Sequence, residues 1–248
     1  MAKRAIVVGA TSGIGLEVAK VLAAKGWQVG IGGRRENLLA QIEAEVPGVV
    51  AAERIDVTAT DATEALDRLI QKLGGMDLYF HSSGIGFQNP SLDFDKEVAT
   101  AETNNVGFTR MVNYAFHYFS ARPEIDGHIA VISSIAQTKG LGAAPAYSAS
   151  KRYVSHYMEC LTQLCAIRHI PNIHLHDIRP GFVRTAILGD GNPYPMQLKP
   201  ADVAREIVRG IERNRAIITV DWKYRILVFF WRLVPRWLWV RLRISTKK

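Results

Sequence analysis

Cysteine is nearly absent from this chain of 248 residues, and its histidines are poorly placed for a metal site. The two cysteines, Cys160 and Cys165, fall on one predicted helix and fit reduced packing residues rather than a disulfide framework. His174 and His176 alternate on one predicted strand, but no carboxylate or third ligand accompanies them at a suitable spacing. We therefore expect neither a disulfide-stabilised secreted fold nor a bound metal.

Long apolar segments are also missing. No apolar stretch precedes the first predicted strand, so we expect no secretory signal and a cytoplasmic protein. The apolar segment near the C-terminus is interrupted by Arg232, Pro235 and Arg236, which leaves it too short to cross a bilayer. A composition of 48% apolar and 22% charged residues is typical of a folded globular domain and argues against disorder.

Acidic residues are scarce relative to basic ones, with 23 Asp and Glu against 31 Lys and Arg, so the formal net charge is +8. Much of the basic excess lies in the last quarter of the chain. Such a tail suits nucleic acid, an anionic membrane surface or a phosphate-rich cofactor, and it also suits a simply solvated face. No groove-reading motif accompanies it, so we expect no nucleic-acid partner.

Short β-branched segments alternate with helical ones along most of the chain. This alternation predicts an α/β fold, a Rossmann-type doubly wound parallel sheet with helices on both faces. The predicted strands cover residues 5–8, 28–31, 49–55, 76–80, 127–132, 172–178 and 216–220, and the predicted helices cover residues 16–25, 60–73, 96–120 and 146–168. No internal repeat or composition break divides them, so we expect a single domain over residues 1–220 and a C-terminal tail over residues 221–248.

A glycine-rich turn lies between the first predicted strand and the first predicted helix, the context in which dinucleotide-binding turns occur. Its spacing, Gly-x-x-x-Gly-x-Gly, differs from the commoner Gly-x-Gly-x-x-Gly. Glycines let the backbone approach a pyrophosphate, whose negative charge the helix N-terminus attracts, although a tight strand–helix connection is the alternative. The candidate cofactor-binding residues of this turn are Gly9, Thr11, Ser12, Gly13, Ile14 and Gly15.

Two arginines, Arg34 and Arg35, follow the second predicted strand. In dinucleotide folds an acidic residue near this position binds the ribose 2′-hydroxyl, whereas an arginine accommodates a 2′-phosphate. Because no Asp or Glu precedes Arg34 here, we expect NADP(H) to be preferred over NAD(H). Two solvated arginines that close a turn are the alternative.

Tyr147 and Lys151 lie four residues apart on a predicted helix and therefore share one face. A free tyrosine, with a pKa of about 10, is a poor base at neutral pH, and a neighbouring ammonium favours its phenolate. We therefore expect Lys151 to lower the pKa of Tyr147 and to make it a proton-transfer group. The hydroxyl of Ser134, at a predicted strand end, would hold a carbonyl oxygen beside it.

Further polar and glycine residues gather where the predicted strands end, which is where open α/β sheets bind their ligands. They are Asp56, Ser82, Ser83, Gly84, Pro180 and Gly181.

Four motifs in order, V-V-G-A-T-S-G-I-G, I-S-S, Y-S-A-S-K and R-P-G-F-V-R-T, resemble those of the short-chain dehydrogenase/reductase family over about residues 3–220. The resemblance is to the branch whose members have about the length of this chain. It implies an oxidoreductase that transfers a hydride between NADP(H) and a carbonyl or alcohol. Tyr147 would be the general acid/base, Lys151 its partner and a ligand of the nicotinamide ribose, and Ser134 the residue that orients the carbonyl.

The same resemblance implies the remaining roles. Asn104 matches the proton-relay asparagine, and the family's spacing favours it over Asn105 and favours Ser134 over Ser133. The residues that would border the adenine ring are Asp56 and Val57, and those that would cover the nicotinamide amide are Pro180, Gly181, Val183 and Thr185.

The chain departs from the family pattern at two places. After the fourth strand it has His81, Ser82, Ser83 and Gly84 where the family has Asn-Asn-Ala-Gly. Serines can replace the hydrogen bonds of the amides, so we expect a shifted but intact cofactor wall. The usual threonine before the first glycine is Val8, which removes one local hydrogen bond.

The tail interleaves tryptophan and phenylalanine with arginine. Packing within the protein or against another subunit of a homo-oligomer, a dimer or tetramer, would cover it, and so would the headgroup layer of a membrane. Peripheral contact with the inner membrane surface would make the protein a reductase for a lipophilic substrate. A non-catalytic cofactor-binding or scaffold protein of the same fold is the other alternative. The apolar candidates for a substrate pocket are Phe87, Leu141, Phe182, Ile187, Leu188, Tyr194 and Met196.

Overall fold

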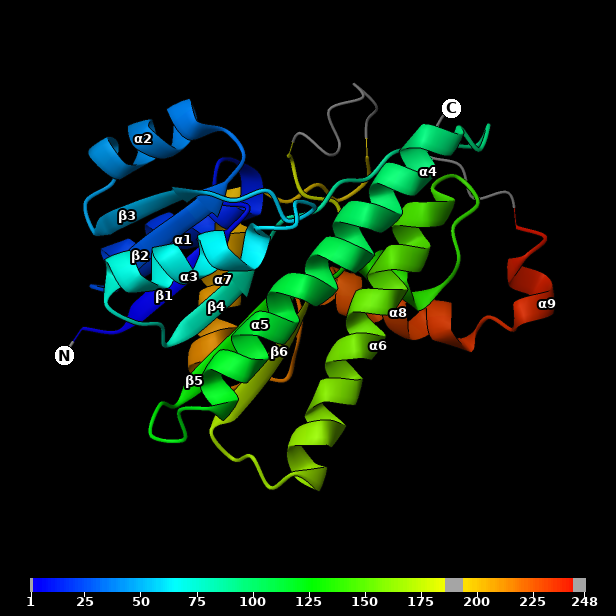
Figure 1. Ribbon diagram of the computed structural model, residues 1–248. Helices are drawn as coiled ribbons and strands as arrows, with labels where there is room; N and C mark the ends of the chain where they lie inside the picture. Colours follow the sequence, from blue (N-terminus) through cyan, green and yellow to red (C-terminus); the bar gives the residue numbers. More distant parts are fainter. Residues whose placement is uncertain (1, 186–193, 243–248) are drawn as a thin grey trace.

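Seven parallel strands form one sheet at the centre of the computed structural model, which describes residues 2–185 and 194–242 (Figure 1). The strands lie in the order β3-β2-β1-β4-β5-β6-β7, so the chain runs outward from β1 first in one direction and then in the other. They are β1 (Arg4–Val8), β2 (Gln28–Gly33), β3 (Val49–Arg54), β4 (Leu78–His81), β5 (Gly127–Ile132), β6 (Ile173–Arg179) and β7 (Ile217–Thr219). Because all neighbours are parallel, every strand ends at the same edge of the sheet.

Helices cover both faces of the sheet and enclose two apolar cores. One core lies under α1 (Gly13–Ala24), α2 (Glu36–Glu45) and α7 (Pro200–Glu212), and the other under α3 (Ala62–Leu73), α5 (Phe108–Ser120) and α6 (Pro145–Ile167). Successive residues of a strand point to opposite faces. In β1, Ala5 and Val7 accordingly belong to the first core, and Ile6 and Val8 to the second.

The predicted α/β class and doubly wound parallel sheet are confirmed. Within the predicted domain, residues 1–220, the helices α2 and α7 have no counterpart among the predicted helices. The signal for α7 was present, because its buried residues recur at intervals of three and four, which is the period of an amphipathic helix. They are Val203, Ala204, Ile207, Val208 and Ile211.

The single helix predicted for residues 96–120 is divided by a change of helical pitch. The structure has α4 (Phe94–Ala101), a π-helical segment η1 (Glu102–Gly107) and then α5. Gly107 packs tightly against the turn that follows β3. A Cβ on Gly107 would lie 2.8 Å from Cγ2 of Val57. The π-helical segment carries Asn104, and such segments are often found at functional sites.

The tail forms two helices, α8 (Trp222–Leu233) and α9 (Arg236–Trp239), at one end of the molecule (Figure 1). Tyr224 and Val228 anchor α8 in a small apolar cluster with Ile135, and Trp239 is buried at the end of α9. Within the residues described, no helix is long and apolar enough to cross a membrane.

Three histidines of β5 and β6 form a stacked cluster. Nδ1 of His128 lies 2.9 Å from Nε2 of His176, and the ring of His128 also stacks on that of His174. No group of three potential metal ligands occurs in the described part of the chain. Burial and, to a smaller extent, the neighbouring imidazoles of His176 and His174 lower the pKa of His128 to about 4. His128 is therefore neutral at physiological pH.

We expect the free energy of unfolding to fall as the pH is lowered from about 6.5 to about 4. The unfolded chain binds a proton at the ordinary histidine pKa of 6.5, whereas folded His128 resists protonation until about pH 4. Its contribution is present above pH 6.5 and amounts at most to about 3 kcal/mol. Urea unfolding of His128→Gln across this range should show a shallower pH dependence, whereas His156→Gln, at an exposed position of α6, should keep the parent slope. An unchanged slope in His128→Gln would contradict this interpretation.

Candidate active site

The glycine turn after β1 presents bare backbone at the N-terminus of α1. Gly9 has φ +90°, and a Cβ there would lie 2.5 Å from the backbone nitrogen of Ser83. A Cβ on Gly15 would lie 2.3 Å from the carbonyl oxygen of Gly9, so neither glycine tolerates a side chain. The first N–H groups of α1 have no partner within the helix. The turn is therefore a cradle suited to an anion such as a pyrophosphate.

Arg34 and Arg35 lie exposed beside this turn, at the end of β2. Arg35 donates hydrogen bonds to the hydroxyl oxygens of Thr11, at 2.6 Å, and Ser12, at 2.9 Å. Burial alone would raise the pKa of Asp56, but hydrogen bonds from Thr58 and the positive charge of Arg34 outweigh it and lower that pKa. Asp56 and the two arginines thus surround one end of the glycine turn.

Ser134, just after the end of β5, faces Tyr147, at the start of α6. Ser134 follows β5 directly, and its hydroxyl oxygen accepts a hydrogen bond from the backbone nitrogen of Ala136 at 3.1 Å. Burial raises the pKa of Tyr147, and a hydrogen bond between its phenol and the Ser134 hydroxyl partly offsets that rise. The adjacent Ser133 instead donates to the carboxylate of Asp177 and to the carbonyl oxygen of Ile178. Of the two serines, Ser134 therefore contacts the tyrosine.

Lys151 lies one helical turn beyond Tyr147, with its Nζ 5.7 Å from the centroid of the tyrosine ring. Its ammonium donates to the carbonyl oxygen of Ile132 at 2.9 Å, and burial lowers its pKa to about 8. The structure thereby corrects the expectation that the pKa of Tyr147 is lowered. Desolvation of the buried phenol dominates, and the lysine is directed toward the end of β5 rather than toward the phenol.

Asn104 joins the same cluster from the π-helical segment. Its side chain accepts from the backbone nitrogen of Ile85 at 2.9 Å and donates to the carbonyl oxygen of Ile85 and to the hydroxyl of Ser150. A Cβ on Gly84 would lie 3.2 Å from Oδ1 of Asn104 and 3.5 Å from Nζ of Lys151. The backbone after β4 therefore passes between the asparagine and the lysine.

Gly86, which the sequence did not single out, lies over the tyrosine. A Cβ at this position would be 2.4 Å from Cδ2 of Tyr147, so any side chain would displace the ring. The Gly84-Ile85-Gly86 spacing after a strand was the signal that could have indicated this close approach.

The loop after β6 links the site to the tail. A Cβ on Gly181 would lie 2.1 Å from the ring of Tyr224, whose hydroxyl accepts from the backbone nitrogen of Phe182 at 3.0 Å. Farther along, Cγ2 of Thr185 would lie 3.1 Å from a Cβ on Gly13, so the loop reaches the glycine turn. These contacts place the segment that begins at Pro180 between the glycine turn and α8.

Of the expected pocket residues, Phe182 packs on Tyr194, with the ring centroids 4.9 Å apart. Phe87 and Met196 are partly exposed near the same edge of the sheet. Ile187 and Leu188 lie outside the described residues.

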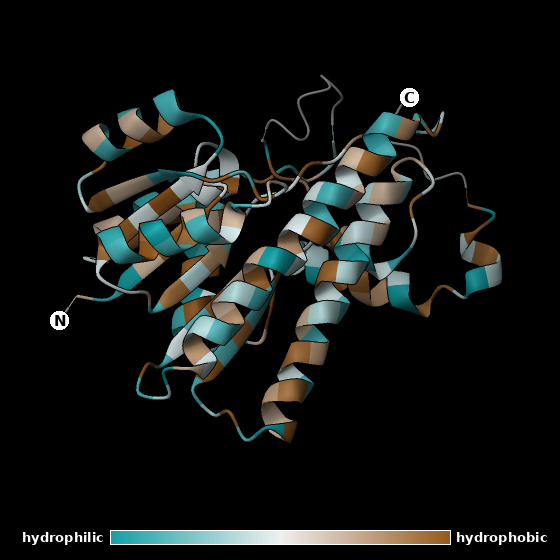
Figure 2. Cartoon of the chain, viewed as in Figure 1, coloured by the Kyte–Doolittle hydropathy of each residue, from teal (hydrophilic) through white to brown (hydrophobic). Residues whose placement is uncertain are grey.

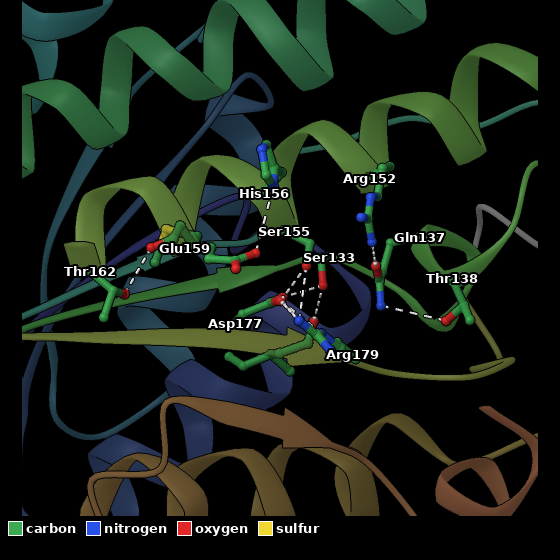
Figure 3. Close-up of polar contacts among 12 residues, drawn as sticks. Ser133, Gln137, Thr138, Arg152, Ser155, His156, Glu159, Thr162, Asp177 and Arg179 are labelled. Carbon is green, nitrogen blue, oxygen red and sulfur yellow. Dashed lines mark hydrogen bonds and ion pairs between the residues drawn. The ribbon is translucent and has the colours of Figure 1, made fainter. Parts of the chain in front are cut away.

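A buried hydrogen-bond network around Asp177, which the sequence analysis missed, lies near Lys151. Figure 3 shows Asp177 with its partners Ser133, Ser155 and Arg179. The carboxylate of Asp177, on β6, accepts hydrogen bonds from Ser133, from Ser155 at 2.7 Å and from Arg179 at 2.7 Å. Its negative charge opposes the effect of burial and raises the pKa of Lys151. The signal was the one carboxylate of this predicted strand, which needs partners if the strand is buried.

Comparison with known proteins agrees with this geometry. Residues 3–193 match the family model of the short chain dehydrogenases. This chain belongs to the short-chain dehydrogenase family. An uncharacterized oxidoreductase of Myxococcus xanthus is 30% identical over 240 residues, which cover 94% of this chain and 93% of the relative. Dehydrogenase/reductase SDR family member 7B of Xenopus laevis is 26% identical and covers 98% of this chain and 81% of the relative.

Solved structures show the same fold. A variant of actinorhodin polyketide ketoreductase, solved with NADPH, superimposes with a TM-score of 0.77 at 25% identity, over 88% of this chain and 95% of that one. A 3-ketoacyl-(acyl-carrier-protein) reductase from Brucella melitensis, complexed with NADH, gives a TM-score of 0.78 at 22% identity, over 88% and 96% of the two chains. The short-chain dehydrogenases are NAD(P)-dependent oxidoreductases, and the protein is therefore an enzyme of that class.

In this short-chain dehydrogenase, His81, the last residue of β4, is the first of the four residues that depart from the family's Asn-Asn-Ala-Gly pattern. Its Nδ1 lies 2.8 Å from the hydroxyl of Tyr79, and the ring packs edge-on against Phe108. Burial lowers the pKa of His81 to about 3, and the charge of Lys151 acts in the same direction. A neutral histidine thus fills the position, and the backbone of Ser82 still bonds to Val8, at 2.8 Å.

We expect Asp177→Ala to lower the free energy of unfolding by about 3–5 kcal/mol, because the largely buried Arg179 would lose its partner. Arg179→Met should also lower the free energy of unfolding, because it leaves the buried Asp177 without its charged partner. The double variant should lose about 1–3 kcal/mol less than the sum of the two, since neither charge is then left alone. Urea unfolding measures all three.

The matched control is Lys20→Ala, which breaks an exposed pair with Glu17 and should cost under about 1 kcal/mol. Strictly additive losses at Asp177 and Arg179 would show that the two groups do not stabilise each other.

Proposed function

We propose that the protein is an NADP(H)-dependent oxidoreductase that interconverts a carbonyl and an alcohol. The interaction of the Ser134 hydroxyl with the phenol of Tyr147, next to Lys151, carries this proposal. Two aligned hydroxyls can hold one carbonyl oxygen, and one of them can donate a proton to it. The similarity to a ketoreductase solved with NADPH supports the same reaction class.

The residues around the glycine turn fit the cofactor. Gly9 and Gly15 let the turn pack tightly with bare backbone at the N-terminus of α1, and Arg34 and Arg35 lie exposed where a ribose 2′-phosphate would need a positive charge. Asp56 with Val57 would border the adenine, and Lys151 would bond the nicotinamide ribose. When bound, NADP(H) supplies or accepts the hydride.

Tyr147 is suited to donate the proton. Because burial raises its pKa, the phenol is neutral at physiological pH and carries the proton that a reduced carbonyl oxygen needs. The Ser134 hydroxyl stabilises the phenolate that remains after donation, since a hydrogen bond to the charged form favours it. Lys151, with a pKa of about 8, is largely protonated at neutral pH and keeps a positive charge beside the tyrosine ring.

Asn104 and Asp177 act through Lys151. The Asn104 amide holds the backbone of Ile85, and it lies across Gly84 from Nζ of Lys151, a place that suits the end of a proton relay. Asp177 counters the desolvation of the ammonium. Both are therefore positioning residues in this proposal.

We expect Tyr147→Phe to bind NADP(H) as the parent does and to lose turnover about a hundredfold to ten-thousandfold, because only the proton donor is removed. A panel of aldehydes, ketones and alcohols, followed at the nicotinamide absorbance, first identifies a substrate, and fluorescence titration measures cofactor binding. Tyr153→Phe, which removes a half-exposed hydroxyl bonded to Thr109 from the same helix, is the control and should keep its turnover. Near-parent turnover in Tyr147→Phe would remove this residue from the mechanism.

NADPH should bind at least about tenfold more tightly than NADH, since a charge-assisted contact to the 2′-phosphate contributes about 1.5–3 kcal/mol. Arg34→Asp should reverse this preference, because it repels the phosphate and offers an acceptor to the ribose hydroxyl. Dissociation constants for both cofactors measure the effect. Arg168→Asp, at the far end of α6, changes the net charge equally and should leave the ratio unchanged. Equal affinities in the parent protein would contradict the assignment.

A further inference from the structure

The outer face of α8 is as apolar as the face that it buries. Tyr224 and Val228 point into the protein, whereas the opposite side carries large apolar side chains in water. They recur at helical spacing and are Trp222, Ile226, Phe229, Phe230 and Leu233, with exposed fractions between 48% and 65%. Trp237 of α9 is 61% exposed as well, and Figure 2 shows hydrophobic residues alternating with hydrophilic ones along α8. A monomer in water normally leaves no apolar surface of this size uncovered.

The charge around this face is mostly positive. From residue 222 to the end of the chain there is no Asp or Glu, and the charged residues of the described part are Lys223, Arg225, Arg232, Arg236 and Arg241. Arg225 also lines a groove beside α7 whose other basic residues are Arg205, Arg209, Arg213 and Arg215. Asp202 and Glu206 lie in the same groove, and Glu206 pairs with Arg225 at 2.9 Å, but the five arginines outnumber the two carboxylates.

We infer that α8 and α9 dock on an anionic membrane surface, with the outer face of α8 in the headgroup layer. Aromatic and aliphatic side chains flanked by arginines are the pattern of a helix that lies in this layer, where the rings enter the apolar boundary and the guanidinium groups reach phosphates. A second copy of the chain fits less well, because pairing the two faces would bring like charges together. The inference does not depend on the proposed reaction.

The docking surface is fixed to the catalytic edge rather than carried on a linker. Lys139 donates to the carbonyl oxygen of Val234 at 2.7 Å, and Nε1 of Trp239 donates to the carbonyl oxygen of Gly140 at 2.8 Å. Both bonds reach the loop that connects Ser134 to α6, and Tyr224 holds the loop after β6. A bilayer bound by the tail would therefore lie beside the loops that frame the candidate site.

The test is cosedimentation of the full-length protein with phosphatidylcholine vesicles prepared with and without phosphatidylserine. We expect association with the anionic vesicles at low salt, weaker association at high salt, and little with phosphatidylcholine alone. Ile226→Glu should weaken the association about tenfold or more, because it removes an inserted apolar side chain and adds a repelled charge. The position is half-exposed, so the variant should fold, which circular dichroism checks.

Val50→Glu is the matched control. Val50 is 51% exposed against 48% for Ile226, and it lies on β3, at the opposite edge of the sheet from β7 and the helix that follows it. This variant should sediment as the parent does. Failure of the parent to bind anionic vesicles at low salt would overturn the inference, and so would equal binding by Ile226→Glu. Light scattering that shows a smaller particle for Ile226→Glu, without any binding to vesicles, would assign the face to a second copy instead.

Discussion

The parallel alignment of the strands is the constraint on which the candidate site depends, because it brings the carboxyl end of every strand to one edge of the sheet. The glycine turn follows β1, Ser134 follows β5 and the Pro180 loop follows β6, although they are far apart in the chain. Crossover helices return the chain from the end of one parallel strand to the start of the next, so the N-termini of α1 and α6 lie at this same edge. The proposed cofactor cradle and the proposed proton-transfer group thus lie at one edge of the sheet.

Desolvation sets the charge states at this edge. Burial raises the pKa of Tyr147 and lowers that of Lys151, so each group is shifted toward its neutral form. The carboxylate of Asp177 opposes the shift of the lysine, and it is itself held by Arg179 and two serine hydroxyls. A lone buried carboxylate would be costly, and this network satisfies its oxygens from β5, β6 and α6. The same contacts connect β6 to α6, which carries Tyr147, and to the end of β5, which Ser134 follows.

The tail is part of the support of the site as well as a surface. Tyr224 fills the space that Gly181 leaves, and its hydroxyl satisfies the backbone nitrogen of Phe182. Through this side chain, α8 packs against the loop expected to cover the cofactor. The outer face of the same helix makes no comparable contact in the described structure and remains apolar. One helix therefore joins the loops at the catalytic edge to the face that we assign to a membrane.

Sequence by itself determined the features that depend on local order. The alternation of strand and helix, the glycine turn before α1 and the four-residue spacing of Tyr147 and Lys151 follow from periodicity and backbone freedom, which neighbouring residues encode. Tertiary structure alone decided that Gly86 must pack against the ring of Tyr147 and that a π-helical segment carries Asn104. It also decided the direction of the Tyr147 pKa and revealed the partners of Asp177. The physical reason is common to these cases: desolvation, close packing and hydrogen bonding depend on groups that are distant in the chain and meet only when the sheet and helices assemble.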